Sequence, residues 1–192
     1  MGDDVGFWVR CRFRERQRAA AVQNLAEYRD TPPYCSPFHS GLSRPESAPS
    51  CSVKPVLYAE DEPDDVFFMH YVWELAAVPN PLVDVKDGQQ AIDYLAGQGL
   101  FADRQKQPLP CLLLLDLNLP GKNGFDVLRW VRQQPDLKSL KVVIVSGSNQ
   151  ETDIETARSL GITDYIVKPS SPKRLLEIFQ EKRGLWLPND DE

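Results

Sequence analysis

The 192-residue sequence lacks long hydrophobic runs and is poor in the residues that build metal or disulfide frameworks. No apolar stretch approaches the roughly 18 residues needed to cross a bilayer, so we expect no membrane association. Two histidines, four cysteines and no CxxC pair argue against a zinc site and a disulfide-stabilised fold. No secretion signal opens the chain, so we expect a cytoplasmic location.

The sequence also lacks an excess of positive charge. Its formal net charge is −6, which argues against nucleic acid as a direct partner. The charge is unevenly spread, because residues 1–52 hold seven Lys or Arg and six Asp or Glu, whereas residues 53–192 hold fifteen and twenty-two. The acidic surplus therefore belongs to the second region.

Residues 1–52 differ from the rest, and we interpret them as a disordered N-terminal extension. The stretch 31–52 is rich in Pro, Ser and Cys and has too few apolar residues to form a core. The preceding arginines allow two interpretations, an arm that binds RNA or anionic lipid and an extension without a role. A native product that begins near Val53 is a further interpretation. The arginines occupy alternate positions: Arg10, Arg12, Arg14, Arg16 and Arg18.

From Pro55 onward, short apolar segments alternate with helical patterns. Five strands alternating with five helices predict an α/β domain with a parallel sheet and right-handed crossovers. We place this domain at residues 53–185 and a C-terminal tail at 186–192. The predicted strands are 56–59, 82–86, 111–116, 141–145 and 165–167. The predicted helices are 64–77, 89–96, 124–134, 151–160 and 172–182.

Chemically active side chains follow four of the predicted strands. The run 111–116 is apolar up to Asp116, which is typical of a strand buried on both faces, and Cys111 should lie inside the sheet. Open α/β sheets bind ligands at the carboxyl ends of their strands. The same edge should carry the acidic pair after the first strand, Ser146 after the fourth and Lys168 after the fifth. The acidic pair is Glu60 and Asp61.

These residues suit phosphoryl transfer better than they suit structural roles. Alone, Asp116 could form a turn, the acidic pair 60–61 could cap a helix, and Ser146 could be an ordinary loop residue. Together, crowded carboxylates repel one another, and Mg²⁺ would relieve the repulsion. Lys168 and Ser146 can contact phosphoryl oxygens, and Asp116 can act as the nucleophile that forms an acyl phosphate. Four fitting residues at four strand ends favour the functional interpretation.

The residues that carry this chemistry resemble the receiver domain of two-component response regulators. The matching motifs are 57–62, 113–121, 143–147 and 164–169. The resemblance implies a flavodoxin-like (βα)5 fold, a doubly wound five-stranded parallel sheet with strand order 2-1-3-4-5. It also implies that Asp116 is the phosphoacceptor and that the Lys168–Pro169 peptide bond is cis. The implied Mg²⁺ ligands are Asp61, Asp116 and the backbone carbonyl of Asn118, with Glu60 assisting through a water.

A narrower resemblance points to single-domain regulators that partner bacterial phytochromes. It rests on the segments 117–124, 135–138, 146–154 and 184–188. It implies a sensor histidine kinase of the phytochrome type as the partner. Two interpretations are open for the apolar residues near the C-terminus, a contact in a homodimer and a cover for the domain's own edge. These residues are Leu185, Trp186 and Leu187.

The resemblance also implies a switch in which Ser146 moves toward the phosphate and Tyr165 enters the vacated space. The switch would bias the face formed by the fourth helix, the fifth strand and the fifth helix, so output would be protein–protein contact. We expect no enzymatic activity beyond self-catalysed phosphorylation and dephosphorylation. An aspartyl-phosphate phosphatase of the haloacid dehalogenase type is one alternative, although Asn118 replaces its general acid. A pseudo-receiver adaptor that takes no phosphate is the other.

Overall fold

The computed structural model describes residues 53–187, and the predictions for residues 1–52 and 188–192 lie outside this range. The strands are β1 (Val56–Ala59), β2 (Leu82–Val85), β3 (Leu112–Leu115), β4 (Lys141–Ser146) and β5 (Asp164–Val167). The helices are α2 (Pro63–Leu75), α3 (Gly88–Ala96), α4 (Gly124–Gln133), α5 (Glu151–Ser159) and α6 (Pro172–Trp186), with short 3₁₀ helices η1 (Gly99–Phe101) and η2 (Pro135–Leu137).

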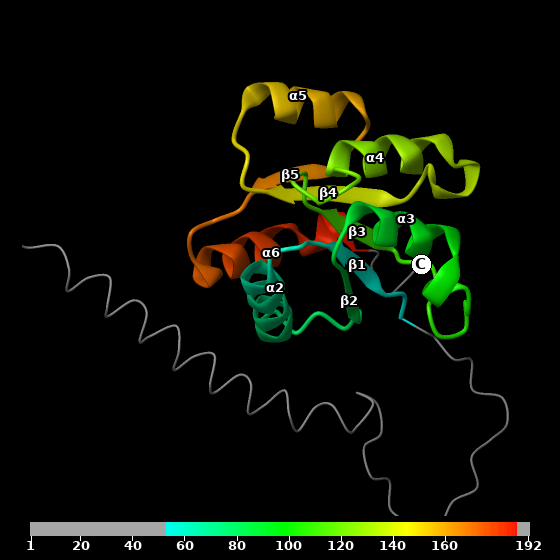
Figure 1. Ribbon diagram of the computed structural model, residues 1–192. Coiled ribbons are helices and arrows are strands. Elements are labelled where there is room, and N and C mark those ends of the chain that lie inside the picture. The colour runs from blue at the N-terminus through cyan, green and yellow to red at the C-terminus, as the bar shows by residue number, and fades with distance from the viewer. Residues whose placement is uncertain (1–52, 188–192) are drawn as a thin grey trace, which may run out of the picture. The chain divides into compact units, whose positions relative to one another are not determined.

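The strands form one parallel sheet in the order β2-β1-β3-β4-β5, with helices on both faces (Figure 1). The predicted flavodoxin-like fold is confirmed. The order reverses after β1, which pairs with both β2 and β3. In open α/β sheets, such a reversal opens a crevice for ligands at the carboxyl ends of the strands.

The central strands are buried throughout, which explains their uninterrupted apolar sequences. Successive side chains of a strand point to opposite faces, so each central strand feeds two cores. In β3, Leu113 and Leu115 join the cluster beneath α3 and α4, whereas Leu112 and Leu114 join the cluster beneath α2 and α6. The residues at the ends of these strands are therefore held in position by a sheet that is packed on both faces.

Cap and turn residues mark the start of α2 and both ends of α3. Asp87 caps α3, because its side chain accepts a hydrogen bond of 2.7 Å from the backbone N–H of Gln90. Gly97 ends the same helix with φ +67°, a left-handed conformation that glycine adopts without a Cβ clash. Pro63 begins α2 at its first turn, where a missing N–H is harmless.

Helix α6 is longer than predicted, since it extends past Lys182 to Trp186. Trp186 is fully buried, its ring packs edge-on against Phe179 at 5.1 Å, and its indole N–H donates to Asp164 at 3.1 Å. These tertiary contacts hold the last turn in place. Trp186 therefore covers the domain's own core, whereas the neighbouring Leu185 is 57% exposed.

Two local predictions were wrong. Residues 53–187 contain no cis peptide bond, so the Lys168–Pro169 bond is trans, the form favoured for X–Pro by about 0.5–1 kcal/mol. Cys111 does not lie inside the sheet but precedes β3 and is partly exposed. None of the helices within this range has the length and apolar character that crossing a membrane would require.

Candidate functional site

The carboxyl edge of the sheet brings together the last residue of β4 and the residues that follow β1, β3 and β5. Hydrogen bonding between strands continues one residue past β1 and β3, because the N–H groups of Glu60 and Asp116 each donate to a neighbouring strand at 3.0 Å. At the other side of the edge, the N–H of Lys168 donates to the carbonyl of Ser146 at 2.8 Å. The backbone therefore fixes each of these positions before any side chain interacts.

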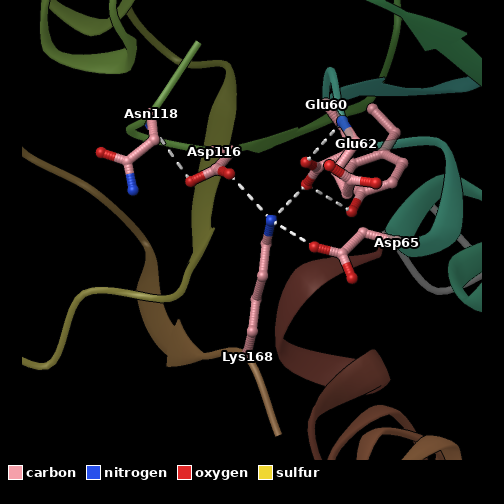
Figure 2. A network of polar contacts seen from close by, with 7 residues as sticks. Glu60, Glu62, Asp65, Asp116, Asn118 and Lys168 are labelled. Carbon is pink, nitrogen blue, oxygen red and sulfur yellow. Dashed lines mark hydrogen bonds and ion pairs between the residues drawn. The ribbon is translucent and has the colours of Figure 1, made fainter. Parts of the chain in front are cut away.

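Lys168 forms the centre of the site, with Asp116 on one side and Glu60 and Asp65 on the other (Figure 2). Its ammonium nitrogen lies 2.6 Å from Glu60 Oε2, 2.7 Å from Asp65 Oδ2 and 2.8 Å from Asp116 Oδ2. Burial alone would lower the pKa of Lys168, but the hydrogen bonds to these carboxylates outweigh burial and raise it above its usual value. Lys168 therefore stays charged.

Glu60 is the most deeply buried carboxylate of the site, with a side chain that is 0% exposed. Burial raises the pKa of Glu60, and hydrogen bonds from Lys168 and Tyr58 offset only part of that rise. The Tyr58 hydroxyl donates to Oε2 at 2.9 Å, and the N–H of Glu62 donates to Oε1 at 3.2 Å. Both carboxylate oxygens are thus held by donors from the chain.

Asp116 is 4% exposed and is held at both carboxylate oxygens. Oδ2 accepts from Lys168, and Oδ1 accepts from the backbone N–H of Asn118 at 3.2 Å. The loop after β3 then returns closely, because a Cβ at Gly124 would overlap the carbonyl oxygen of Asp116. This close approach explains why glycine begins α4.

Three carboxylates of the site are near enough to share a cation. Glu60, Asp61 and Asp116 each offer an oxygen, and these oxygens all lie within 4.8 Å of one another. Hard divalent cations such as Mg²⁺ and Mn²⁺ favour such all-oxygen ligand sets. Asp61 is exposed, which leaves this side of the group open to solvent. The donor chemistry therefore fits a divalent cation.

Ser146 and Tyr165 lie beside this group on β4 and β5. Ser146 is fully buried, and its hydroxyl has no hydrogen-bond partner among residues 53–187. A buried hydroxyl without a partner is unfavourable, so this atom could accept or donate to an incoming group. The Tyr165 hydroxyl donates to the carbonyl of Ser148 at 2.9 Å, which ties its ring to the loop after β4.

The sequence-predicted residues 60, 61, 116, 146 and 168 thus meet at one edge of the sheet. Sequence reasoning missed Tyr58 and Asp65. Tyr58 could have been found because it lies in β1 two positions before Glu60, where the strand-like hydrogen bonding continues, so both side chains point to the same face. Asp65 had a weaker signal, since acidic residues in a first helical turn usually serve the helix dipole.

Comparison with known proteins gives a consistent family. Residues 56–180 match the family described as "Response regulator receiver domain". The chain is similar to Response regulator Rcp1 of Synechocystis sp., with 34% identity over 134 residues that cover 70% of this chain and 89% of Rcp1.

Solved structures of similar sequence give the same result. Response regulator RPA3017, described in red light signalling of R. palustris, superposes with a TM-score of 0.66 and 35% identity and covers 71% of this chain and 99% of its own. A phosphorylated cyanobacterial phytochrome response regulator, RcpA, superposes with a TM-score of 0.64 and 33% identity and covers 71% of this chain and 99% of its own. A Mn²⁺-bound form of Rcp1 superposes with a TM-score of 0.63 and 33% identity and covers 71% of this chain and 96% of its own.

Proposed function

The chain belongs to the response regulator receiver domain family, and from this membership we propose that it accepts a phosphoryl group on Asp116 from a sensor histidine kinase. The observation that carries the proposal is the environment of Asp116. Its carboxylate lies at the carboxyl end of β3, within reach of the Lys168 ammonium and beside two further carboxylates. This combination provides a nucleophile, a fixed positive charge and a place for a cation.

A divalent cation, Mg²⁺ in our proposal, belongs to this function. Asp61, Asp116 and the backbone carbonyl of Asn118 would hold it, and Glu60 would assist through a water. The cation would neutralise negative charge around a transferring phosphoryl group. Two observations support the fit, the three carboxylates whose oxygens lie within 4.8 Å and the Mn²⁺ bound in the structure of the similar protein Rcp1.

The transfer itself is a displacement at phosphorus. A carboxylate oxygen of Asp116 attacks the phosphorus of a phosphohistidine, a P–O bond forms, and the P–N bond breaks as the electron pair returns to the imidazole. The product is an acyl phosphate on Asp116, and the imidazole takes up a proton from solvent. Lys168 and Ser146 would each contact one phosphoryl oxygen. Hydrolysis by water later restores the carboxylate and releases inorganic phosphate.

The signal would leave the site through Ser146 and Tyr165. We propose that Ser146 turns toward the phosphoryl group and that Tyr165 moves into the vacated space, which alters the face made by α5, β5 and α6. Two observations support this path. The Ser146 hydroxyl has no hydrogen-bond partner among residues 53–187 that it would have to leave. The Tyr165 hydroxyl makes one hydrogen bond, to the carbonyl of Ser148 in the loop after β4.

We propose a phytochrome-type histidine kinase as the input, because RcpA is described as a phytochrome response regulator and RPA3017 is described in red light signalling. Output would be contact with another protein, and a homodimer is part of the proposal. A cytoplasmic location fits the free thiol of Cys111. In such a dimer, Leu185 offers an exposed contact, whereas the buried Trp186 does not.

The test is chemical phosphorylation followed by intact mass measurement. With phosphoramidate and Mg²⁺, we expect the mass of one added phosphoryl group, and we expect Asp116→Asn to remain unmodified. Asp126→Asn is the matched control, because it removes a surface carboxylate from α4 and should be modified like the wild type.

Three other outcomes would each change the assignment. An unmodified wild type would support the pseudo-receiver. A phosphorylated Asp116→Asn would move the acceptor elsewhere. Sustained release of phosphate from a generic phosphomonoester would support the haloacid dehalogenase type of phosphatase.

A further inference from the structure

Tyr58 places a hydroxyl group inside the core, directly beneath the candidate site. It lies in β1, is 1% exposed and packs among the apolar residues beneath α2 and α6. Its hydroxyl donates to Glu60 Oε2 at 2.9 Å. A carboxylate oxygen can only accept, so the Tyr58 hydroxyl is the donor in this hydrogen bond.

The Glu60 carboxylate depends on few donors. Oε2 accepts from Tyr58 and from Lys168, and Oε1 accepts from the backbone N–H of Glu62. A buried carboxylate that loses a donor is strongly destabilised, because solvent cannot replace the lost hydrogen bond. The number of donors at Oε2 therefore decides whether Glu60 keeps its place.

Lys168 is already fully engaged. An ammonium group has three N–H donors, and Lys168 contacts three carboxylates at 2.6, 2.7 and 2.8 Å. Under the proposed function Lys168 must also contact a phosphoryl oxygen, so at least one of the three carboxylates must lose its hydrogen bond from Lys168. If Glu60 does so, Tyr58 is the side-chain donor that remains on Oε2.

We propose that Tyr58 is a positioning residue that holds Glu60 in place when Lys168 turns to the phosphoryl group. This inference rests on the proposed function. Tyr58 touches neither the cation nor the phosphoryl group and acts through Glu60. Its hydroxyl therefore contributes more to the state with Mg²⁺ and a phosphoryl group than to the metal-free state.

The test compares two tyrosine hydroxyls. Tyr58→Phe removes the donor on Glu60, and Tyr94→Phe is the matched control. Tyr94 is also fully buried, but its hydroxyl donates to the carbonyl of Pro108 at 3.1 Å and its ring lies in the other core cluster. Thermal unfolding of the metal-free proteins checks that both variants fold.

Binding then separates the two variants. We measure Mg²⁺ affinity by calorimetry and the Mg²⁺-dependent binding of beryllofluoride, a phosphoryl mimic, by fluorine NMR. Tyr58→Phe should weaken beryllofluoride binding by roughly 10-fold, the lower end of the effect of lost outer-shell partners. Its Mg²⁺ affinity should fall by a smaller factor. Tyr94→Phe should stay within about two-fold of the wild type, because its hydroxyl donates to Pro108 rather than to a residue of the site.

A double variant tests whether Tyr58 acts through Glu60. If it does, adding Tyr58→Phe to Glu60→Gln should cause little further loss of beryllofluoride affinity. Equal binding by Tyr58→Phe and Tyr94→Phe, or full additivity in the double variant, would overturn the inference. A wild type that bound neither Mg²⁺ nor beryllofluoride would instead overturn the proposed function, so the two failures are distinguishable.

Discussion

The two ends of β5 each carry a lysine–carboxylate cluster, and the clusters differ in their balance. The carboxyl-edge cluster consists of Glu60, Asp61, Asp65, Asp116 and Lys168. The amino-edge cluster consists of Asp164, Lys182 and Trp186. There one carboxylate accepts from Lys182 at 2.7 Å, from the Trp186 indole at 3.1 Å and from the N–H of Tyr165 at 2.8 Å.

The amino-edge cluster is complete by itself, whereas the carboxyl-edge cluster is not. At the amino edge, both carboxylate oxygens of Asp164 accept hydrogen bonds, and the charges of Asp164 and Lys182 balance one to one. At the carboxyl edge, one ammonium serves three carboxylates, Asp61 adds a fourth, and the nearby Ser146 hydroxyl is buried without a partner in residues 53–187. Surplus negative charge and an unsatisfied hydroxyl therefore distinguish a ligand site from a structural ion pair.

The largest effect should come from Trp186→Ala at the amino edge. Losing a fully buried indole should lower the free energy of unfolding by about 3–5 kcal/mol. Urea denaturation measures the loss, and Leu185→Ala, at a 57% exposed neighbour, should change it by no more than about 0.5 kcal/mol. Mg²⁺ affinity of folded Trp186→Ala should equal that of the wild type, and a weaker affinity would mean that the two clusters are coupled.

Asp164→Asn should also destabilise the protein, by about 2 kcal/mol. The charged acceptor shared by Lys182 and Trp186 is lost, and the amide offers only one oxygen to replace two. The same denaturation experiment applies. A neutral or stabilising effect would show that the amino edge is not the closed structural cluster described above.

Asp61→Asn should have the opposite sign at the carboxyl edge. Without divalent cations, the variant should be more stable than the wild type by about 1 kcal/mol, because one repulsion among crowded carboxylates is removed. Its Mg²⁺ affinity should fall by more than about 10-fold. Calorimetry and denaturation in EDTA measure the two effects, and destabilisation in EDTA would contradict the idea of surplus charge.

A smaller effect should appear in the pH dependence of stability. Burial raises the pKa of Glu60 in the folded protein above its usual value of 4.5. At pH values between 4.5 and this raised pKa, the folded protein therefore binds more protons than the unfolded chain. The contribution of Glu60 to the free energy of unfolding therefore falls as pH rises through this window. The wild-type value minus that of Glu60→Gln, measured in EDTA, should decrease with pH. A difference that rises instead would mean that Lys168 outweighs burial.

Most of the fold was predictable because strands that are buried on both faces of the sheet have uninterrupted apolar sequences. The uninterrupted apolar runs of β1 and β3, with an acid directly after each, locate the centre of the sheet and its functional edge. Parallel strands then bring their carboxyl ends together whatever their separation in the chain. Glu60, Asp116, Ser146 and Lys168 could be placed in one site for this reason.

Other features depend on contacts that no local pattern records. The end of α6 is set by the burial of Trp186 against Phe179, and the sequence around Lys182 carries no sign of it. The participation of Asp65 depends on how α2 packs against α6 and β2, because this packing fixes its distance to Lys168. Tertiary geometry, rather than spacing, chooses these partners.

The most direct test of the central claim is a crystal structure of the protein with Mg²⁺ and beryllofluoride. We predict beryllofluoride on the Asp116 carboxylate, the cation against Asp61 and Asp116, and a Lys168 that has left at least one of its present carboxylate partners. An Asp116 carboxylate without beryllofluoride at saturating concentrations, with Lys168 still on all three carboxylates, would contradict the account.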